Sequence, residues 1–229
     1  MAEQDACVVV PVYNEASVLA DVLHGLMSRF EHVICIDDGS ADASASIVSA
    51  SGAHLIRHSV NLGQGAALQT GFEWVAGHTS FAHLVTFDAD GQHDAGDAFR
   101  MLDVARSRDL DVVLGSRSTG SVAGQPRARR WLLQAAVRFS RLTTGLELSD
   151  THNGLRVLSR FAFERIELRQ HGMAHASELE HQIARLRLSW GECPVSVSYT
   201  DYSRTKGQGN LNSINILADL LASRMRVAS

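Results

Sequence analysis

Short apolar runs alternate with longer amphipathic stretches through the first half of the chain. Runs rich in β-branched residues predict strands, whereas apolar residues repeated every three or four positions predict helices. We expect strands at 6–10, 33–36, 54–57, 84–87 and 111–114, with helices between them at 16–30, 41–50, 65–76 and 95–107. This alternation is typical of an α/β fold, in which crossover helices cover both faces of a mostly parallel sheet.

The regular alternation of strand and helix patterns ends after residue 115. Amphipathic periodicity predicts helices at 131–146, 160–166 and 177–188, a strand at 195–199 and a further helix at 211–227. With 229 residues, of which 45% are hydrophobic, the chain is long enough for one sizeable core. It contains no repeat or linker, so we expect a single domain over residues 1–229.

Polar side chains follow each of the first four strands, in the turns 11–15, 37–40, 61–65 and 88–90. Ligands of open α/β sheets bind beyond the carboxyl ends of the strands, so we expect these turns to converge on one site. Tyr13 would stack on a flat base, and Asn14 would cap the following helix. Asp37 or Asp38 would accept from a base N–H or from ribose. Ordinary strand-to-helix turns explain the same residues without a ligand.

The most informative stretch is the acidic motif DADGQH at residues 88–93. In an extended segment, residues two apart point the same way, so Asp88, Asp90 and Gln92 would offer three oxygen ligands on one side. Such ligands suit Mg²⁺ or Mn²⁺, which keeps open positions for substrate phosphates when one or two carboxylates hold it. A solvated turn is the alternative interpretation. His93 is expected beside the metal ligands rather than among them.

The net charge of −4 hides an uneven distribution. Residues 1–115 carry 16 acidic and 5 basic side chains, whereas residues 116–229 carry 9 acidic and 16 basic ones. Six arginines and no acid lie between residues 116 and 145, which indicates either a phosphate-binding segment or a solvated helix face. Nucleic acid is a poor match, because aromatic residues do not interleave with the basic ones. Lys206 is the one lysine among 21 basic residues, which indicates a site that needs a compact charge.

The cysteines and the apolar runs indicate the cellular compartment in which the protein works. Cys7, Cys35 and Cys193 are odd in number and far apart, as expected of buried thiols in a reducing compartment. No apolar run approaches the ~20 residues that cross a bilayer, and no signal-peptide pattern precedes the first strand. We therefore expect a cytoplasmic protein. The helix at 131–146 would lie on the inner face of the membrane, unless its apolar side packs on the sheet.

Taken in order, five motifs resemble the family 2 inverting glycosyltransferases with the GT-A fold. They are VVVPVYNE at 8–15, IDDGSAD at 36–42, NLGQGAA at 61–67, DADGQH at 88–93 and GSR at 115–117. The resemblance covers residues 6 to about 200. Within the family the chain is most similar to the dolichyl- or polyprenyl-phosphate mannose or glucose synthases, because DTHNGLR at 150–156 resembles their motif after the basic helix. Members with membrane tails are longer than this chain, so any membrane attachment is expected to come from surface helices or from a small membrane-spanning partner protein.

The resemblance implies roles for individual residues. The nucleotide-sugar-binding residues would be Pro11, Tyr13, Glu15, Ile36, Asp38, Asp88, Ala89, Asp90, Arg204 and Lys206. The metal would be held by Asp88, Asp90 and Gln92, and the acceptor phosphate by Arg117, Arg127, Arg129, Arg130 and Arg156. The catalytic residues would be Asp90, Arg117 and Lys206, the last on a loop that closes over the donor. Thr200 stands where family members often carry an arginine, which leaves Arg204 as its substitute.

The acceptor decides whether a base is needed. A phosphate monoester is largely dianionic near neutral pH, its second pKa being about 6, so it needs cations rather than a base. A sugar hydroxyl would need one, and His152, Asp150 or Glu178 are the options. Loop structure is the other interpretation of His152 and Asp150.

The sequence therefore indicates a metal-dependent hexosyltransferase of the cell envelope. It would move a hexose from GDP-mannose or UDP-glucose to polyprenyl phosphate, with residues 1–115 binding the donor and residues 116–229 the acceptor. One alternative is a glycosyltransferase that acts on a hydroxyl of a growing cell-surface polysaccharide. Another is a non-catalytic, nucleotide-sugar-binding regulatory subunit.

Overall fold

A computed structural model describes residues 2–117, 137–138, 140–150, 153–170 and 174–198 of the chain. Strands and helices alternate through the first half, as the sequence predicts. The elements in this half are β1 (Glu3–Val12), α1 (Leu19–Met27), β2 (Phe30–Asp37), α2 (Ser44–Ser51), β3 (His54–Arg57), α3 (Gln64–His78), β4 (His83–Thr86), α4 (Ala95–Ser107) and β5 (Val112–Ser116). The second half adds β6 (Arg156–Ser159), α6 (Arg160–Phe163), α7 (Ala174–Arg185) and β7 (Trp190–Pro194).

The described strands form one sheet in the order β3-β2-β1-β4-β6-β5-β7. All neighbouring strands run parallel except β6, which pairs antiparallel with both β4 and β5. The carboxyl ends of the parallel strands therefore meet at one edge of the sheet. The amino end of β6 reaches the same edge, because Arg156 pairs with Thr86 and with Leu114.

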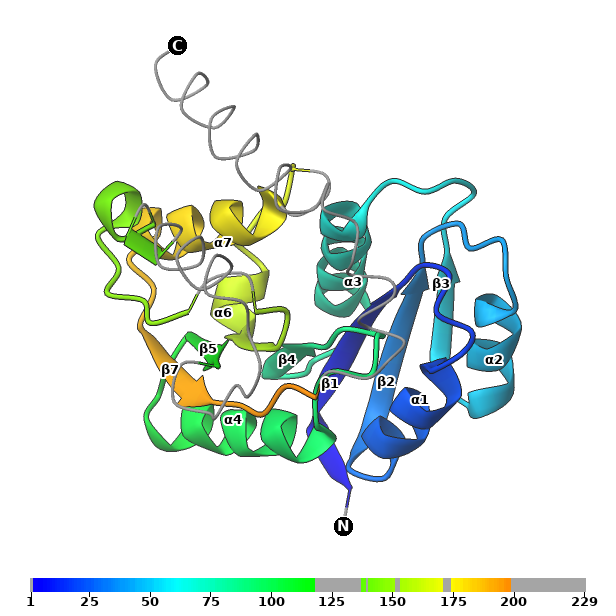
Figure 1. Ribbon diagram of the computed structural model, residues 1–229. Helices are drawn as coiled ribbons and strands as arrows, with labels where there is room; N and C mark the ends of the chain where they lie inside the picture. The colour runs from blue at the N-terminus through cyan, green and yellow to red at the C-terminus, as the bar shows by residue number, and fades with distance from the viewer. Residues whose placement is uncertain (1, 118–136, 139, 151–152, 171–173, 199–229) are drawn as a thin grey trace.

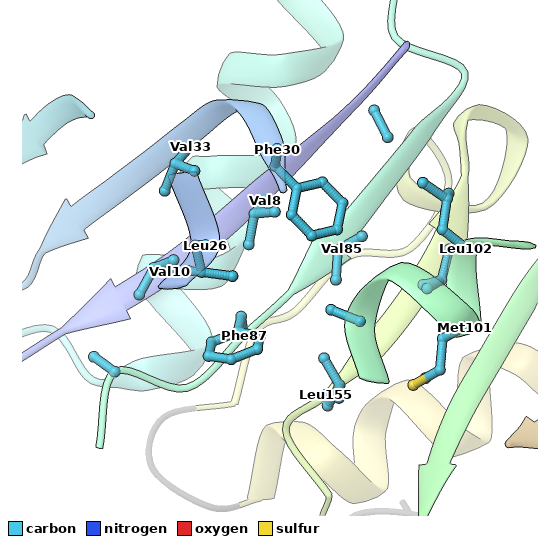
Figure 2. Packing of buried hydrophobic residues seen from close by; sticks show 14 of the residues in the cluster. Val8, Val10, Leu26, Phe30, Val33, Val85, Phe87, Met101, Leu102 and Leu155 are labelled. Atoms are coloured by element: carbon cyan, nitrogen blue, oxygen red, sulfur yellow. The ribbon is translucent and has the colours of Figure 1, made fainter. Parts of the chain in front are cut away.

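Helices cover both faces of the sheet, as Figure 1 shows. Alternate residues of β1 point to opposite faces, so its continuous apolar run fills two cores. Val8 and Val10 pack with α1, α2 and α4 on one face, whereas Cys7 and Val9 pack with α3, α6 and α7 on the other. The close packing of the first core around Phe30 is seen in Figure 2.

Several sequence expectations were wrong in position. The helix expected from residue 16 begins at Leu19, because residues 15–18 form a turn in which the Glu15 carbonyl accepts from Val18 N and Leu19 N. The strand expected at 195–199 lies earlier, as β7. The pairing of β7 with β5 decides its position, which local propensity cannot reveal.

Strand β6 was not predicted at all, and its first residue, Arg156, was singled out only as the end of the motif at 150–156 and as a phosphate-binding residue. Four residues are too few to show a periodicity, and the strand exists because it fills the space between β4 and β5. The predicted helix at 131–146 is confirmed only at residues 137–138 and 140–144, and its remainder and the helix expected at 211–227 lie outside the described residues. The three cysteines are free and buried, as expected.

Two glycines of α3 provide a test of the packing. A Cβ added to Gly71 would lie 2.4 Å from Cγ1 of Val9, whereas a Cβ on Gly77 would have nothing within 4 Å. Gly71→Ala should therefore lower the free energy of unfolding by about 1–3 kcal/mol through overpacking. Gly77→Ala should leave it unchanged or raise it by up to about 1 kcal/mol, because alanine favours the helix.

Urea denaturation of both variants measures the difference. Equal stabilities of the two variants would contradict the close approach of α3 to β1.

Candidate active site

The polar turns that follow β1 and β2 are joined by hydrogen bonds. Asn14, which has a φ of 54°, donates its backbone N–H to the Ser40 hydroxyl at 2.9 Å. Its side-chain oxygen accepts from Ala41 N, also at 2.9 Å. The expected helix cap at Asn14 is thus wrong: the side chain bridges two strand ends and leaves α1 without a side-chain cap.

The turn after β2 is joined in the same way to the segment before α3. Asp38 is buried, and its carboxylate accepts from Leu62 N at 2.9 Å and from Gly63 N at 2.7 Å. The ring of His58 lies 2.7 Å from the same carboxylate. Asp38 was expected to contact the nucleoside, and in this structure its oxygens hold the loop before α3. Its neighbour Asp37 pairs with Arg57, whose Nε lies 2.9 Å from Oδ2.

Exposed apolar side chains lie on the first and third of these turns. Tyr13 and Leu62 are each 45% exposed, which suits a surface that would take a flat base. Pro11 lies in β1 opposite Ile36 of β2. Ile36 is fully buried in the core on the α3 side, so its side chain does not face this surface.

The acidic motif follows β4 in a turn rather than in an extended segment. The premise that residues two apart point the same way is therefore wrong here, although the two carboxylates do lie close enough to influence each other. Gln92 donates its backbone N–H to Asp90 Oδ1 at 3.0 Å and its side-chain amide to Oδ2 at 2.7 Å. Gln92 thus orients Asp90, and its amide nitrogen faces that carboxylate.

Asp88 is held by residues from three parts of the chain. Gln64, the first residue of α3, donates its amide to Oδ1 at 2.9 Å, and His93 Nε2 lies 3.4 Å from Oδ2. The backbone of Gly154 lies so close that an added Cβ would come within 1.9 Å of Oδ2. The Asp88 side chain remains 26% exposed. The sequence interpretation missed Gln64 in this role, because only the fold brings α3 to the end of β4.

The two carboxylates differ in proton affinity. Burial alone would raise the pKa of Asp88, but the hydrogen bond to His93 and the charges of His93, Arg156 and His175 lower it overall. The pKa of Asp90 is raised, first by burial and then by the negative charge of Asp88. Two carboxylates that are held close together repel each other, and a bound cation would relieve this repulsion.

The residues fit a divalent ion that is completed by a ligand. Within the described ranges, no group of three His, Cys, Asp or Glu side chains could hold a metal ion alone. Mg²⁺ in substrate sites, however, is usually bound by one or two carboxylates together with phosphate oxygens, and Asp88 and Asp90 provide that number. Ala89 between them is buried in the core, which anchors the turn.

Two predicted phosphate-binding arginines lie at the same edge in different settings. Arg117 makes a two-pronged pair with Asp150, with Nε at 2.7 Å from Oδ2 and a terminal nitrogen at 2.6 Å from Oδ1. Arg156 is buried at the start of β6, where the charges of Asp88 and Glu180 act on its guanidinium. The other predicted cations lie outside the described residues: Arg127, Arg129, Arg130, Arg204 and Lys206.

The expected bases are engaged in structural contacts. Asp150 pairs with Arg117, and Glu178 accepts from the backbone N–H groups of Arg169 and Gln170 at 2.8 and 2.9 Å. His152 and Thr200 lie outside the described residues. The sequence interpretation missed Glu180, a buried acid on α7. Helical periodicity places it on the apolar face with Ala176 and Ile183, and this is the signal that could have found it.

None of the helices in the described part of the chain has the length and apolar character that crossing a bilayer requires.

Comparisons with known proteins agree with this architecture. The polyprenol monophosphomannose synthase of Mycolicibacterium smegmatis is 28% identical over 93% of this chain and 83% of its own length. The undecaprenyl-phosphate mannosyltransferase of Micrococcus luteus is 26% identical over 89% of this chain and 87% of its own length. A UDP-N-acetylglucosamine–dolichyl-phosphate N-acetylglucosaminyltransferase of Methanococcus voltae is 26% identical over 98% of both chains.

Solved structures confirm the GT-A fold. Glucosyl-3-phosphoglycerate synthase from Mycobacterium tuberculosis, in complex with Mn²⁺, UDP-glucose and phosphoglyceric acid, superposes with a TM-score of 0.68 at 18% identity. The match covers 95% of this chain and 78% of that one. The same enzyme has also been solved with Mg²⁺ and UDP, again with a TM-score of 0.68 and 18% identity, over 95% of this chain and 78% of that one.

The family model described as glycosyl transferase family 2 matches residues 7–167, which include the four strand-end turns and the whole of β6. The chain therefore belongs to glycosyl transferase family 2, and it is a glycosyltransferase with the GT-A fold.

Proposed function

We propose that this glycosyltransferase moves a hexose from a nucleoside diphosphate sugar, GDP-mannose or UDP-glucose, to polyprenyl phosphate. The proposal rests on one observation above all: Asp88 and Asp90, a carboxylate pair suited to a divalent ion, influence each other, and Asp88 also lies within electrostatic reach of the buried cation Arg156. The polyprenyl-phosphate sugar transferases among the relatives support the same acceptor.

The donor would occupy the edge formed by the first four turns. Tyr13 would stack on the base, while Pro11 and Glu15 border the same turn. Asp38 would shape the nucleoside site through the loop that it holds at Leu62 and Gly63. Residues 1–115 would thus bind the donor. Because Asp38 already accepts these hydrogen bonds, we assign recognition of the base to the neighbouring surface that carries Tyr13 and Leu62.

Mg²⁺ or Mn²⁺ would be held by Asp88 and Asp90, with Gln92 keeping Asp90 in place. When bound, such an ion stabilises the negative charge that develops on a leaving diphosphate. Gln64 and His93 hold the Asp88 carboxylate toward this position. Arg204 and Lys206, outside the described residues, are proposed to neutralise the same diphosphate from a closing loop.

The acceptor phosphate would be positioned by arginines. A largely dianionic phosphate has no proton to lose, so its attack on the anomeric carbon would need no base. The attack would come from the face opposite the nucleoside diphosphate, whose bond to that carbon breaks as the new bond forms, and the configuration would therefore invert. Arg156 and Arg117 are the described candidates, joined by Arg127, Arg129 and Arg130 of residues 116–229. A sugar hydroxyl would require a base, and the two expected bases in the described part of the chain, Asp150 and Glu178, are engaged in structural contacts, which supports the phosphate acceptor. The third expected base, His152, lies outside that part.

Mutation of Asp90 tests the metal assignment. Asp90→Ala should leave the fold intact and reduce kcat/KM by roughly 10³-fold, because a cation ligand is lost beside the leaving group. The measurement is transfer from radiolabelled donor in a Mg²⁺ and Mn²⁺ titration. Asp103→Ala, which removes an exposed carboxylate from α4, serves as the control. Unchanged metal dependence in the Asp90 variant would refute the assignment.

Gly154 tests the position of Asp88 without changing a charge. Gly154→Ala would place a Cβ 1.9 Å from Asp88 Oδ2, so the carboxylate must move. We expect the affinity for the nucleoside diphosphate in the presence of Mg²⁺ to fall roughly tenfold or more, because a small displacement of a charged ligand is costly. Calorimetry measures this affinity, with Gly77→Ala as the control. Wild-type affinity would show that Asp88 is not a ligand.

The acceptor and the membrane are tested together. If Arg127, Arg129 and Arg130 serve a lipid phosphate, their triple alanine variant should bind anionic liposomes more weakly, by about 1 kcal/mol per residue at low salt. It should also transfer less hexose to polyprenyl phosphate. Flotation and transfer assays compare it with an Arg108, Arg165 and Arg185 triple alanine variant, which loses the same charge from exposed positions. Equal behaviour of the two variants would exclude a role for the cluster.

A donor assay also separates the remaining candidates. A regulatory subunit would bind the donor without turnover, whereas a polysaccharide glycosyltransferase would transfer hexose to a glycan hydroxyl and ignore polyprenyl phosphate. A membrane-spanning partner, if required, would raise transfer in native membranes above that in liposomes.

A further inference from the structure

The side chain of Glu192, on β7, holds the backbone of residues 149–150. Its Oε1 accepts from the backbone N–H of Ser149 at 2.8 Å and from that of Asp150 at 3.3 Å. Glu192 is partly exposed, and β7 is the last strand in the order of the described sheet. A carboxylate that accepts from two successive backbone N–H groups restricts the backbone between them, because hydrogen bonds to a charged acceptor are strong. The proposed mechanism gives Glu192 no task.

Asp150 in turn holds Arg117. Its Oδ2 accepts from the backbone N–H of Arg117 at 2.9 Å and from Nε at 2.7 Å, and its Oδ1 accepts from a terminal guanidinium nitrogen at 2.6 Å. The hydroxyls of Ser116 and Ser149 lie 2.7 Å apart and join the same two segments. A two-pronged pair fixes the plane of a guanidinium as well as its position. Arg117 is therefore oriented by Asp150, whose own backbone is held by Glu192.

Arg117 lies at the edge of the sheet that carries the proposed metal site. It directly follows β5, in which Gly115 donates its backbone N–H to the Leu155 carbonyl at 3.0 Å. Gly154, the residue before Leu155, is the one whose added Cβ would meet the Asp88 carboxylate. The end of β5 and the acidic motif are thus joined through two successive residues. The side chain of Arg117 is 20% exposed, so part of it is accessible to a phosphate at this edge.

We propose that Glu192 is a positioning residue for Arg117, which acts through the backbone of Asp150 and thereby orients the guanidinium toward the acceptor phosphate. This inference rests on the proposed function, in which Arg117 binds that phosphate. The reach of the Glu192 oxygen, rather than its negative charge, produces the effect, because its hydrogen bonds in the described part of the chain go to backbone N–H groups. A shift of about 1 Å in such an arrangement costs up to roughly 10²-fold in rate.

Two substitutions of Glu192 separate reach from charge. Glu192→Gln removes the charge but keeps a carbonyl oxygen at the same distance, and both hydrogen bonds go to one oxygen, so this variant should behave like the wild type. Glu192→Asp keeps the charge but withdraws the carboxylate by one methylene. We expect it to raise the dissociation constant of farnesyl phosphate, a soluble polyprenyl phosphate, roughly tenfold. Calorimetry measures this constant with Mg²⁺ and a nucleoside diphosphate present.

Further measurements distinguish positioning from a general structural role. In Glu192→Asp, the affinity for UDP or GDP with Mg²⁺ should stay unchanged, because that ligand is assigned to the two carboxylates of the acidic motif. In an Arg117→Lys background, Glu192→Asp should have a much smaller effect on farnesyl phosphate, since lysine cannot make the two-pronged pair. Glu147→Asp, which shortens an exposed acid of the segment before β6, should leave both affinities unchanged. Urea denaturation checks that each variant is folded.

Several results would overturn the inference. Wild-type affinity of Glu192→Asp for farnesyl phosphate would show that Glu192 does not position Arg117, and so would the absence of probe binding by the wild type. Weaker binding by Glu192→Gln than by Glu192→Asp would assign the effect to charge. An equal loss of affinity for the nucleoside diphosphate, or an undiminished effect in the Arg117→Lys background, would leave Glu192 a structural role alone.

Failure of the proposed function has a different signature. Farnesyl phosphate would then bind with the expected dependence on Glu192, but no hexose would be transferred to polyprenyl phosphate.

Discussion

The carboxylate of Asp88 is the point at which distant parts of the chain meet. It follows β4, accepts from Gln64 at the start of α3 and contacts the backbone of Gly154 before β6. Each contact is short, so none of the three segments can move without displacing the others. The hydroxyl of Thr86 adds a bond of 2.7 Å to the Gly154 carbonyl and ties β4 to the same segment. The position of the proposed metal site is thus fixed by the packing of the sheet edge and does not depend on one flexible loop.

At the same edge of the sheet, most charged side chains lie next to a side chain of opposite charge. Asp37 pairs with Arg57, Arg117 pairs with Asp150, and Arg156 is influenced by two acids. Buried charges of this kind contribute little net stability, because desolvation offsets their attraction. Their value lies in orientation: a paired side chain has few alternative positions. Asp90 differs from the others, since burial and the charges of Asp88 and Glu15 raise its pKa, and a bound cation would offset the repulsion between the carboxylates.

Much of this fold could be predicted from the sequence, because its strands are strongly apolar and each ends in polar residues. The strand at 54–57 and the helix at 95–107 were predicted to the residue. The convergence of the turns followed from the rule that parallel strands end at one edge. It is confirmed by the hydrogen bonds that Asn14 N donates to Ser40 and that Leu62 N donates to Asp38. What local pattern could not supply was pairing across the sheet. Strand β6 and the true bounds of β7 depend on neighbours that are distant in the sequence.

The site was predictable in its residue types but not in its orientations. Spacing alone placed Asp88, Asp90 and Gln92 in an extended row, yet the turn makes Gln92 a donor to Asp90. Asp38 was expected at the nucleoside, and its carboxylate accepts from the backbone of the loop before α3. Both differences have one cause: a polar group near a strand end must first satisfy nearby backbone donors, and only the remaining capacity is left for substrate. Asp88 keeps an exposed side-chain fraction of 26% after meeting these demands, whereas Asp38 is buried and accepts from two backbone N–H groups, so Asp88 has more capacity left for a ligand.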